Sequence, residues 1–236
     1  MHLLLFDIDG TLVRVNRAGR RAVQTALEDL VGTDLSTDGV SFSGKTDPQI
    51  LSEVLAANGI EASDALVSDA LEVYAEAAAP VLSSSTVTAL PGTQPLLTAL
   101  ADRDDVQLAL LTGNIEAMAY RKLEAVSMAQ YFSFGAFGSD HADRNRLPEV
   151  ALRRARRDTG RAFAASETVI IGDTIHDIEC GQTAGARCVG VCSGSDDRAA
   201  LSRAGADLLF EDLRDRDAFC RAVLHDRPSQ RPHGSG

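Results

Sequence analysis

The sequence lacks an apolar run long enough to cross a membrane. Its longest strongly apolar runs, such as residues 3–6 and 108–111, are far shorter than the roughly 20 residues of a membrane-spanning helix. The first residues enter an apolar segment with two acids and contain no basic region or long apolar stretch, which argues against a secretion signal. We therefore expect a cytoplasmic protein that does not associate with a membrane.

Cysteine and lysine are both scarce. The four cysteines show no Cys-x-x-Cys spacing, so we expect reduced, mostly buried thiols. Only two of the 23 basic residues are lysines, and 34 acidic residues give a net charge of −11. This charge argues against nucleic-acid binding, because phosphate backbones attract basic surfaces. A small anionic partner is compatible with the composition if cations line its site locally.

Short apolar segments bounded by turn residues alternate with helical patterns along most of the chain. The expected strands are residues 3–6, 106–111, 132–137, 168–171, 188–191 and 207–210. The expected helices are residues 92–103, 115–126, 148–159, 175–184, 197–204 and 211–224. Buried strands separated by helices are typical of a parallel sheet covered on both faces, so the sequence predicts an α/β fold.

Residues 15–85 depart from this alternation and show helical patterns only, over residues 15–31, 47–58 and 64–82. We expect a helical insertion there, between residues 1–14 and 86–227, which together would form the α/β core. The polar stretch 228–236 is rich in Gly, Pro and Ser and is expected to be a disordered tail.

Two acids close the first expected strand. Asp7 and Asp9 are two positions apart, so their side chains can point the same way from its carboxyl end. Carboxylates packed together at the edge of a sheet repel each other unless a cation lies between them. Gly10 permits a sharp turn after this pair, and Thr11 can offer hydrogen-bond donors.

A second acidic pair follows the fourth expected strand, where Asp173 ends the strand and Asp177 lies one turn into the next helix. Ligands of open α/β sheets bind outside the carboxyl ends of the strands, so the two pairs converge there if their strands are neighbours. Such an oxygen-rich environment suits Mg²⁺. Thr112, Gly113 and Asn114 also end a strand, and a hydroxyl and an amide there can hold an oxyanion.

These three elements, in this order, resemble the haloacid-dehalogenase-like hydrolases from residue 3 to about residue 210. Asp-x-Asp-Gly-Thr-Leu is a highly specific match and Gly-Asp-Thr-x-x-Asp nearly so, whereas Thr-Gly-Asn alone would be weak. The resemblance implies a Rossmann-like three-layer α/β/α core with a parallel sheet, and a small helical cap inserted after the first motif. The segment 15–85 is most similar to the cap of the phosphoglycolate-phosphatase-like branch.

The resemblance also implies a mechanism. Asp7 would attack the phosphorus and become an aspartyl phosphate, and Asp9 would protonate the leaving alcohol and then activate water. Mg²⁺ would be held by the Asp7 carboxylate, the Asp9 backbone carbonyl and Asp173. Asp177 would orient the metal's waters.

The loop after the second strand would bind the phosphoryl group. By the same resemblance, Thr112 and the Gly113 amide would hold phosphoryl oxygens, with Asn114 beside them as a substrate-binding residue. In the cap, Lys45 is a candidate substrate contact, although a plain turn that caps the following helix is an equal alternative.

The sequence departs from the family pattern at one point. The family usually has a lysine ahead of the helix before the fourth strand, where this chain has Arg144 and Arg146. Either arginine could supply the positive charge, because arginine also pairs with phosphate and carboxylate. Arg144 is slightly preferred, since Arg146 lies closer to the expected start of the helix.

The leading hypothesis is Mg²⁺-dependent hydrolysis of a small phosphorylated metabolite. A sugar-phosphate mutase, a pyrophosphatase or a nucleotidase could use the same aspartyl phosphate, and a binding protein with an inactive site is a further alternative. The sequence specifies neither the substrate nor the oligomeric state.

Overall fold

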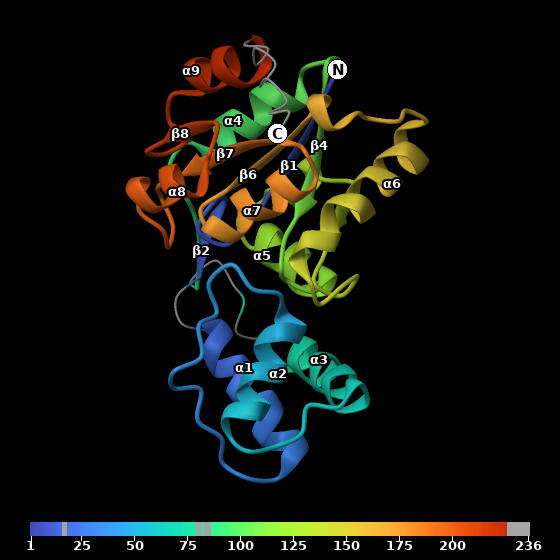
Figure 1. Ribbon diagram of the computed structural model, residues 1–236, viewed down its shortest axis with the longest axis vertical. Helices are drawn as coiled ribbons and strands as arrows, with labels where there is room; N and C mark the ends of the chain where they lie inside the picture. The colour runs from blue at the N-terminus through green and yellow to red at the C-terminus, as the bar shows by residue number, and fades with distance from the viewer. Residues whose placement is uncertain (16–17, 79–81, 83–85, 226–236) are drawn as a thin grey trace, which may run out of the picture.

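The structure is a computed structural model that describes residues 1–15, 18–78, 82 and 86–225 of the chain. An α/β part occupies one end of the molecule and three helices occupy the other (Figure 1). The expected tail at residues 228–236 lies outside the described residues. Within the described part of the chain, no helix is long and apolar enough to cross a membrane.

The α/β part is built on a parallel sheet with the strand order β5-β4-β1-β6-β7-β8. The strands are β1 His2–Phe6, β4 Val106–Leu111, β5 Gly135–Ala136, β6 Thr168–Gly172, β7 Arg187–Val191 and β8 Leu208–Phe210. Leu5 of β1 pairs with Ala109 on one side and Ile170 on the other, so β1 lies between β4 and β6. The residues that follow these three strands therefore meet at one edge of the sheet.

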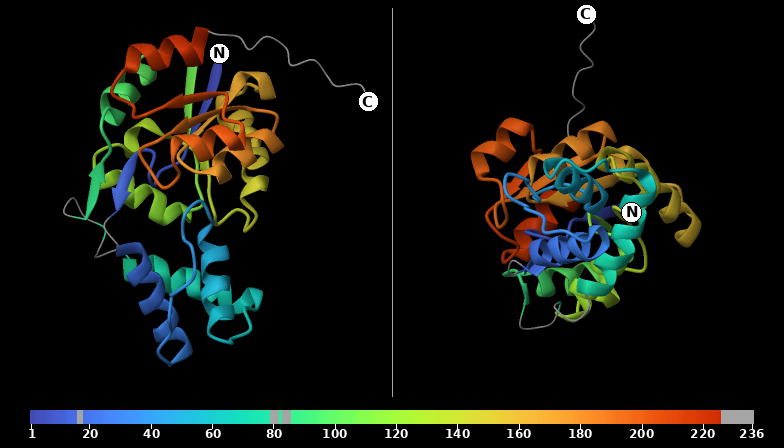
Figure 2. Two further views of the ribbon diagram at one scale, coloured as in Figure 1. Left: turned by 60° about the vertical axis from the view of Figure 1, so that its left-hand side comes forward. Right: turned by 90° about the horizontal axis from the view of Figure 1, so that it is seen from below.

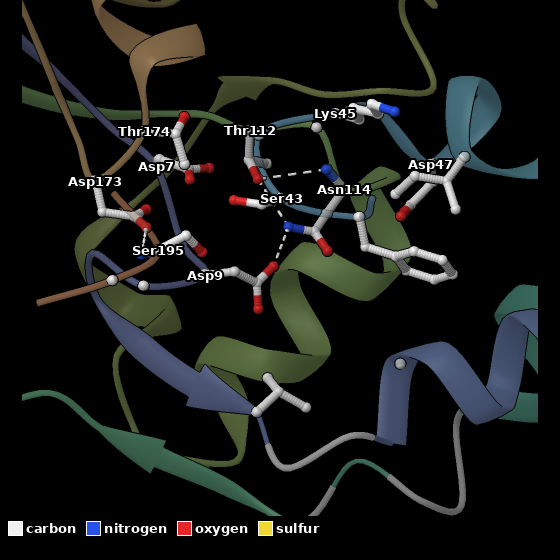
Figure 3. A pocket seen from close by; sticks show the side chains of 18 of the residues that line it. Asp7, Asp9, Ser43, Lys45, Asp47, Thr112, Asn114, Asp173, Thr174 and Ser195 are labelled. Carbon is white, nitrogen blue, oxygen red and sulfur yellow. Dashed lines mark hydrogen bonds between the residues drawn. The ribbon is translucent and has the colours of Figure 1, made fainter. Parts of the chain in front are cut away.

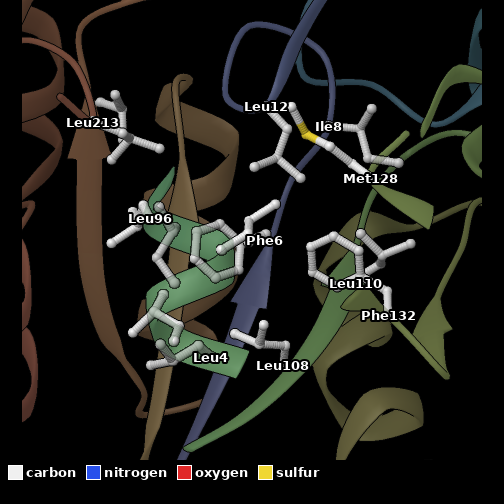
Figure 4. Close-up of a cluster of buried hydrophobic side chains, with 14 of the residues drawn as sticks. Leu4, Phe6, Ile8, Leu12, Leu96, Leu108, Leu110, Met128, Phe132 and Leu213 are labelled. Atoms are coloured by element: carbon white, nitrogen blue, oxygen red, sulfur yellow. The ribbon is translucent and has the colours of Figure 1, made fainter. Parts of the chain in front are cut away.

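Helices cover both faces of the sheet, because successive side chains of β1 point to opposite sides. The helices of the α/β part are α4 Thr93–Ala101, α5 Glu116–Glu124, α6 Leu147–Thr159, α7 Ile175–Thr183, α8 Arg198–Ala204 and α9 Arg216–Cys220. Leu4 and Phe6 belong to one buried cluster with residues of α4, α5 and α9. Figure 4 shows them beside Leu96 of α4. Leu3 and Leu5 pack with residues of α6 and α7 on the other face. The predicted three-layer α/β/α fold is confirmed.

Two predicted elements of the α/β part differ from the structure. The expected strand 132–137 is reduced to Gly135–Ala136, which pairs with Leu110 and Leu111 only. Phe132 and Phe134 are buried in clusters on opposite faces of the sheet, so their apolar character reflects burial rather than strand pairing. The expected helix 211–224 begins only at Arg216, because the Asp215 side chain accepts from the Ala218 amide and caps the helix there.

The remaining helices are α1 Ala18–Val31, α2 Asp47–Ala57 and α3 Asp64–Ala78, and we refer to residues 18–78 as the cap. They bury a separate apolar cluster that includes Val23, Leu27, Leu51 and Leu55. Met118 of α5 belongs to the same cluster, so the cap packs its apolar side against the core.

A short antiparallel pair of strands connects the two parts. β2 Val13–Val15 pairs with β3 Val87–Ala89, with Val15 opposite Val87 (Figure 2). The expected helix start at residue 15 is therefore wrong: Val15 is in a strand, and α1 begins at Ala18. The β-branched valines at both ends of this pair favour the extended conformation.

Replacing Leu4 with alanine tests the position of the central strand. Leu4 is fully buried on β1, so the substitution should lower the free energy of unfolding by about 2–5 kcal/mol. Leu208 lies on the edge strand β8 and is only partly buried, so Leu208→Ala should cost clearly less. Urea unfolding followed by circular dichroism gives both values, and equal losses would contradict a central β1.

Candidate active site

The first acidic motif and the loop after β6 come into close contact at the carboxyl edge of the sheet. Gly10 has a φ of 79°, and a Cβ atom at this position would lie 2.3 Å from Asp173 Oδ2. Only glycine permits both this conformation and this approach. The Thr11 hydroxyl donates to Asp173 Oδ1 at 3.2 Å, and the Ser195 amide donates to Asp173 Oδ2 at 2.8 Å.

Three buried carboxylates lie together at this edge. Asp7, Asp173 and Asp177 each offer one oxygen atom, and these oxygens lie within 4.8 Å of one another. Burial raises the pKa of Asp7 to about 6, while Arg144 opposes the shift and Asp177 adds to it. Burial likewise raises the pKa of Asp173, with Asp177 and Asp7 contributing. The cluster therefore holds more negative charge than its surroundings stabilise, which favours a bound cation.

Asp177 serves the local structure as well as the cluster. It is fully buried in the first turn of α7, and its Oδ2 accepts from the Thr174 amide at 3.0 Å and from the Thr174 hydroxyl at 2.7 Å. Its Oδ1 accepts from Arg144. The two oxygens of Asp177 therefore hold the start of α7 and the Arg144 side chain in place beside the cluster.

The structure brings Arg144 into the cluster and leaves Arg146 outside it. Arg144 is 7% exposed; its Nη2 lies 3.2 Å from Asp7 Oδ1 and also donates to Asp177. Its Nη1 donates to the Gly44 carbonyl of the cap at 3.2 Å, and its Nε is buried with no hydrogen-bond partner among the described residues. Arg146 is exposed at the start of α6 and does not line the cavity between the cap and the carboxyl edge of the sheet.

The loop after β4 faces the first acidic motif across the site (Figure 3). The Asn114 side-chain amide donates to Asp9 Oδ2 at 2.8 Å and to Thr112 Oγ1 at 2.8 Å. A Cβ atom on Gly113 would lie 2.1 Å from the Lys45 carbonyl oxygen, so glycine is required where the cap approaches this loop. Thr112, Gly113 and Asn114 therefore all line the site.

Sequence reasoning missed the buried lysine of the site. Lys122 of α5 is 5% exposed, and its Nζ lies 2.6 Å from Asp9 Oδ2 and 2.5 Å from Asn114 Oδ1. Two signals could have identified it: it is one of only two lysines in the chain, and it lies two helical turns after Asn114 on the helix that this loop begins.

The other lysine is directed away from the carboxylates. Lys45 contributes to the cavity wall, but its Nζ donates to Glu53 of α2 at 2.5 Å. Figure 3 shows the Lys45 side chain pointing away from Asp7 and Asp9. The structure therefore brings the Lys45 backbone, rather than its ammonium group, next to the loop that contains Gly113.

Asp47 links the cap to the core. It is the first residue of α2 and 6% exposed; its amide donates to the Gly113 carbonyl at 2.8 Å and its Oδ2 accepts from the Ile115 amide at 2.8 Å. The neighbouring Thr46 hydroxyl donates to the Ala142 carbonyl at 2.6 Å. Burial raises the pKa of Asp47 to about 6, although Lys122 opposes the shift.

A cavity of about 400 Å³ lies between the cap and the carboxyl edge of the sheet. Its core side is lined by the acidic motifs, the loops after β4 and β7 and the two buried cations: Asp7, Asp9, Gly10, Thr112, Gly113, Asn114, Lys122, Arg144, Asp173, Thr174, Gly194 and Ser195. Its cap side and the connecting strand contribute Arg14, Val15, Gly19, Arg20, Phe42, Ser43, Gly44, Lys45, Asp47, Ile50 and Tyr74.

Replacing Arg144 with methionine tests its part in the carboxylate cluster. The change leaves Asp7 and Asp177 without their shared cation, so in the presence of a chelator it should lower the free energy of unfolding by about 3–5 kcal/mol. The exposed Arg146→Met should change it by less than about 0.5 kcal/mol. Urea unfolding of both variants measures the difference, and equal effects would contradict the assignment of Arg144 to the cluster.

Replacing Asp47 with asparagine tests the buried carboxyl group of the link. Because the pKa of Asp47 is about 6 in the folded protein, against an ordinary value of 3.8, the folded state binds its proton more tightly than the unfolded chain. This contribution to stability is present below the ordinary value and is lost as the pH rises through about 6. Asparagine keeps an acceptor for Ile115 and carries no charge.

The stability of Asp47→Asn relative to the wild type should therefore increase by on the order of 2–3 kcal/mol between about pH 4 and pH 7. Asp64→Asn, at the exposed first position of α3, is the matched control and should show a much smaller change. Urea unfolding across this pH range provides the comparison. A pH-independent difference for Asp47→Asn would rule out the raised pKa.

Comparison with known proteins identifies the family. The protein-family model described as haloacid dehalogenase-like hydrolase matches residues 4–191 of the chain. Phosphoglycolate phosphatase of Pseudomonas fluorescens (strain Pf0-1) is 27% identical over 216 residues, which cover 90% of this chain and 77% of that protein. Probable phosphatase IndB of Dickeya dadantii (strain 3937) is 28% identical over 225 residues, 94% of each chain.

Solved structures share the fold. A hydrolase from Pseudomonas syringae has a TM-score of 0.71 at 23% identity and covers 94% of this chain and 99% of its own. CbbY from Rhodobacter sphaeroides, in complex with phosphate, has a TM-score of 0.72 at 20% identity, with 91% of this chain and 96% of its own covered. The family match spans both acidic motifs and the cap between them, and the chain therefore belongs to the haloacid dehalogenase-like hydrolases.

Proposed function

We propose that this enzyme is a Mg²⁺-dependent phosphatase that hydrolyses a small phosphomonoester through an aspartyl phosphate on Asp7. The observation that carries the proposal is the position of Asp7 beside Asp173 and Asp177, with Arg144 in contact with the same carboxylate, in the wall of a cavity between cap and core. The curated relatives named phosphatases support the same reaction class.

The residues present fit a magnesium ion. Three buried carboxylates face a single arginine, so negative charge is in excess, and the available donors are oxygen atoms. Hard oxygen donors suit Mg²⁺. Asp7, Asp173 and the Asp9 backbone carbonyl would hold the ion, with Asp177 behind them. The bound ion would supply electrostatic relief between an anionic nucleophile and an anionic phosphate.

The chain's own residues then supply the covalent chemistry. An Asp7 oxygen forms a bond to phosphorus as the bond to the ester oxygen breaks, and Asp9 gives its proton to the leaving alcohol. Asp9 next takes a proton from water, whose oxygen attacks the phosphorus of the aspartyl phosphate. Inorganic phosphate leaves and the Asp7 carboxylate is restored.

Three further groups would hold phosphoryl oxygens during these steps. Thr112 Oγ1 accepts hydrogen bonds from Asn114, so its own proton can be donated to a phosphoryl oxygen. The Gly113 amide belongs to the same loop, and the Nε of Arg144 is a buried donor that a phosphoryl oxygen or a water molecule would satisfy.

We infer a substrate of metabolite size. The cavity of about 400 Å³ is closed on one side by the cap, and small-molecule sites are concave volumes of this order. The names of the curated relatives make phosphoglycolate the first compound to test. A cytoplasmic location and the absence of nucleic-acid binding stay predictions.

Phosphate release with Mg²⁺, measured across a metabolite panel that includes phosphoglycolate and an aryl phosphate, tests the proposal. The wild type should release phosphate, and Asp7→Asn should be at least about a thousandfold slower, because the variant lacks the nucleophile. Chelation should abolish the activity and Mg²⁺ should restore it. Asp64→Asn serves as the matched control on the cap surface.

Two results would overturn the proposal. Equal rates from the wild type and Asp7→Asn would contradict the assignment of Asp7 as the nucleophile. Transfer of the phosphoryl group back to the substrate without release of phosphate would instead identify a mutase.

A further inference from the structure

Lys122 is a buried lysine whose ammonium group is committed to the site. Lysine is almost never fully buried unless it is paired, and this side chain is only 7% exposed. Its neighbours on α5, Ala119 and Leu123, are fully buried in the apolar cluster between helix and sheet. The lysine therefore extends from an apolar layer, and its charge is stabilised by two acceptors, Asp9 Oδ2 at 2.6 Å and Asn114 Oδ1 at 2.5 Å.

Asn114 completes a closed network with the same carboxylate oxygen. Its Oδ1 accepts from Lys122, while its Nδ2 donates to Asp9 Oδ2 and to Thr112 Oγ1, each at 2.8 Å. The amide orientation is therefore fixed by partners of both kinds. Two donors converge on Asp9 Oδ2, one from Lys122 and one from Asn114.

This convergence distinguishes the two oxygens of Asp9. Oδ2 is held by the network, and the Asp9 side chain is 42% exposed in the wall of the cavity. A half-exposed carboxylate without such partners would be free to rotate about its side-chain bonds. With Oδ2 held, Oδ1 is the oxygen available to exchange a proton with a group in the cavity.

We propose that Lys122 is a positioning residue, which holds Asp9 Oδ2 so that Oδ1 meets the oxygen of the leaving alcohol. The inference rests on the proposed function, in which Asp9 is the acid. A general acid contributes only when it lies within hydrogen-bond reach of the atom that it protonates, so loss of its orientation should reduce this contribution. The loss should depend on the leaving group, because a stable leaving anion needs no proton.

Lys122→Met, which keeps the length of the side chain and removes the charge, tests this role with two esters. Glycerol phosphate has a poor leaving group, the glycerol alkoxide. For this ester kcat/KM should fall about 100-fold, within the range that general acids supply. For 2,4-dinitrophenyl phosphate, whose leaving anion is stable without a proton, kcat/KM should fall less than about 3-fold. The ratio of the two values does not depend on the fraction of variant that is folded.

Further variants separate positioning from a structural role. Lys122→Arg, which keeps the charge and the donors, should restore most of the ratio. Asp9→Asn should show the same leaving-group dependence, and Lys122→Met added to it should change the ratio no further, since both act through one carboxylate. Arg121→Met is the matched control on α5: Arg121 donates to the Ala75 carbonyl of the cap at 2.7 Å, and its loss should leave the ratio as in the wild type.

An equal fall for both esters in Lys122→Met would overturn the inference, because a structural defect or the loss of a direct substrate contact affects both alike. This outcome is distinct from failure of the proposed function. If the wild type released phosphate from no compound of the metabolite panel, the function itself would fail. If the wild type and Asp7→Asn behave as proposed and Lys122→Met keeps the wild-type ratio, only the role of Lys122 is wrong.

Discussion

Repulsion among carboxylates held away from water is the constraint around which this site is organised. Asp7, Asp173 and Asp177 are each at most 5% exposed, and burial of several negative charges is unfavourable unless cations and donors compensate. Arg144 contacts two of the three, and Thr11 and Ser195 donate to the third. This compensation is incomplete, and the remaining charge is what makes the cluster suitable for a divalent cation. The buried negative charge that makes folding less favourable is therefore the same charge that would bind the cation of the proposed reaction.

Close approach of backbones is a second constraint, and it joins the cap to the core. The cap segment before α2 packs so tightly on the loop after β4 that a Cβ atom on Gly113 would overlap the Lys45 carbonyl. Within the core, a Cβ atom on Gly138 would in turn overlap the Gly113 carbonyl. Asp47 uses both its amide and its carboxylate across this contact. Since the same loop contributes Thr112 and Asn114 to the site, the position of the cap and the shape of the site depend on each other.

Local sequence patterns predicted which strands and helices exist better than they predicted where these elements begin and end. The buried apolar runs identified the strands next to the site, because strands covered on both faces form short apolar runs between turns. The same rule overextended β5, since Phe132 and Phe134 are buried without strand pairing. The start of α1 was misplaced because β2 and β3 form a strand pair between residues more than 70 positions apart, which no local window contains.

The sequence by itself determined that Asp7 and Asp173 each follow a buried strand. Only the tertiary structure decided that they meet, because it pairs β1 with β6 in parallel and so brings both acids to the same edge of the sheet. The sequence also could not determine which arginine contacts Asp7 and Asp177. Arg144 and Arg146 are two positions apart on a short turn, and only the packing of that turn against α7 directs one inward and the other to solvent. Sequence reasoning also singled out Lys45 and missed Lys122: the tertiary structure directs Lys122 to Asp9 and Lys45 to Glu53, and these pairs join residues that no local pattern relates.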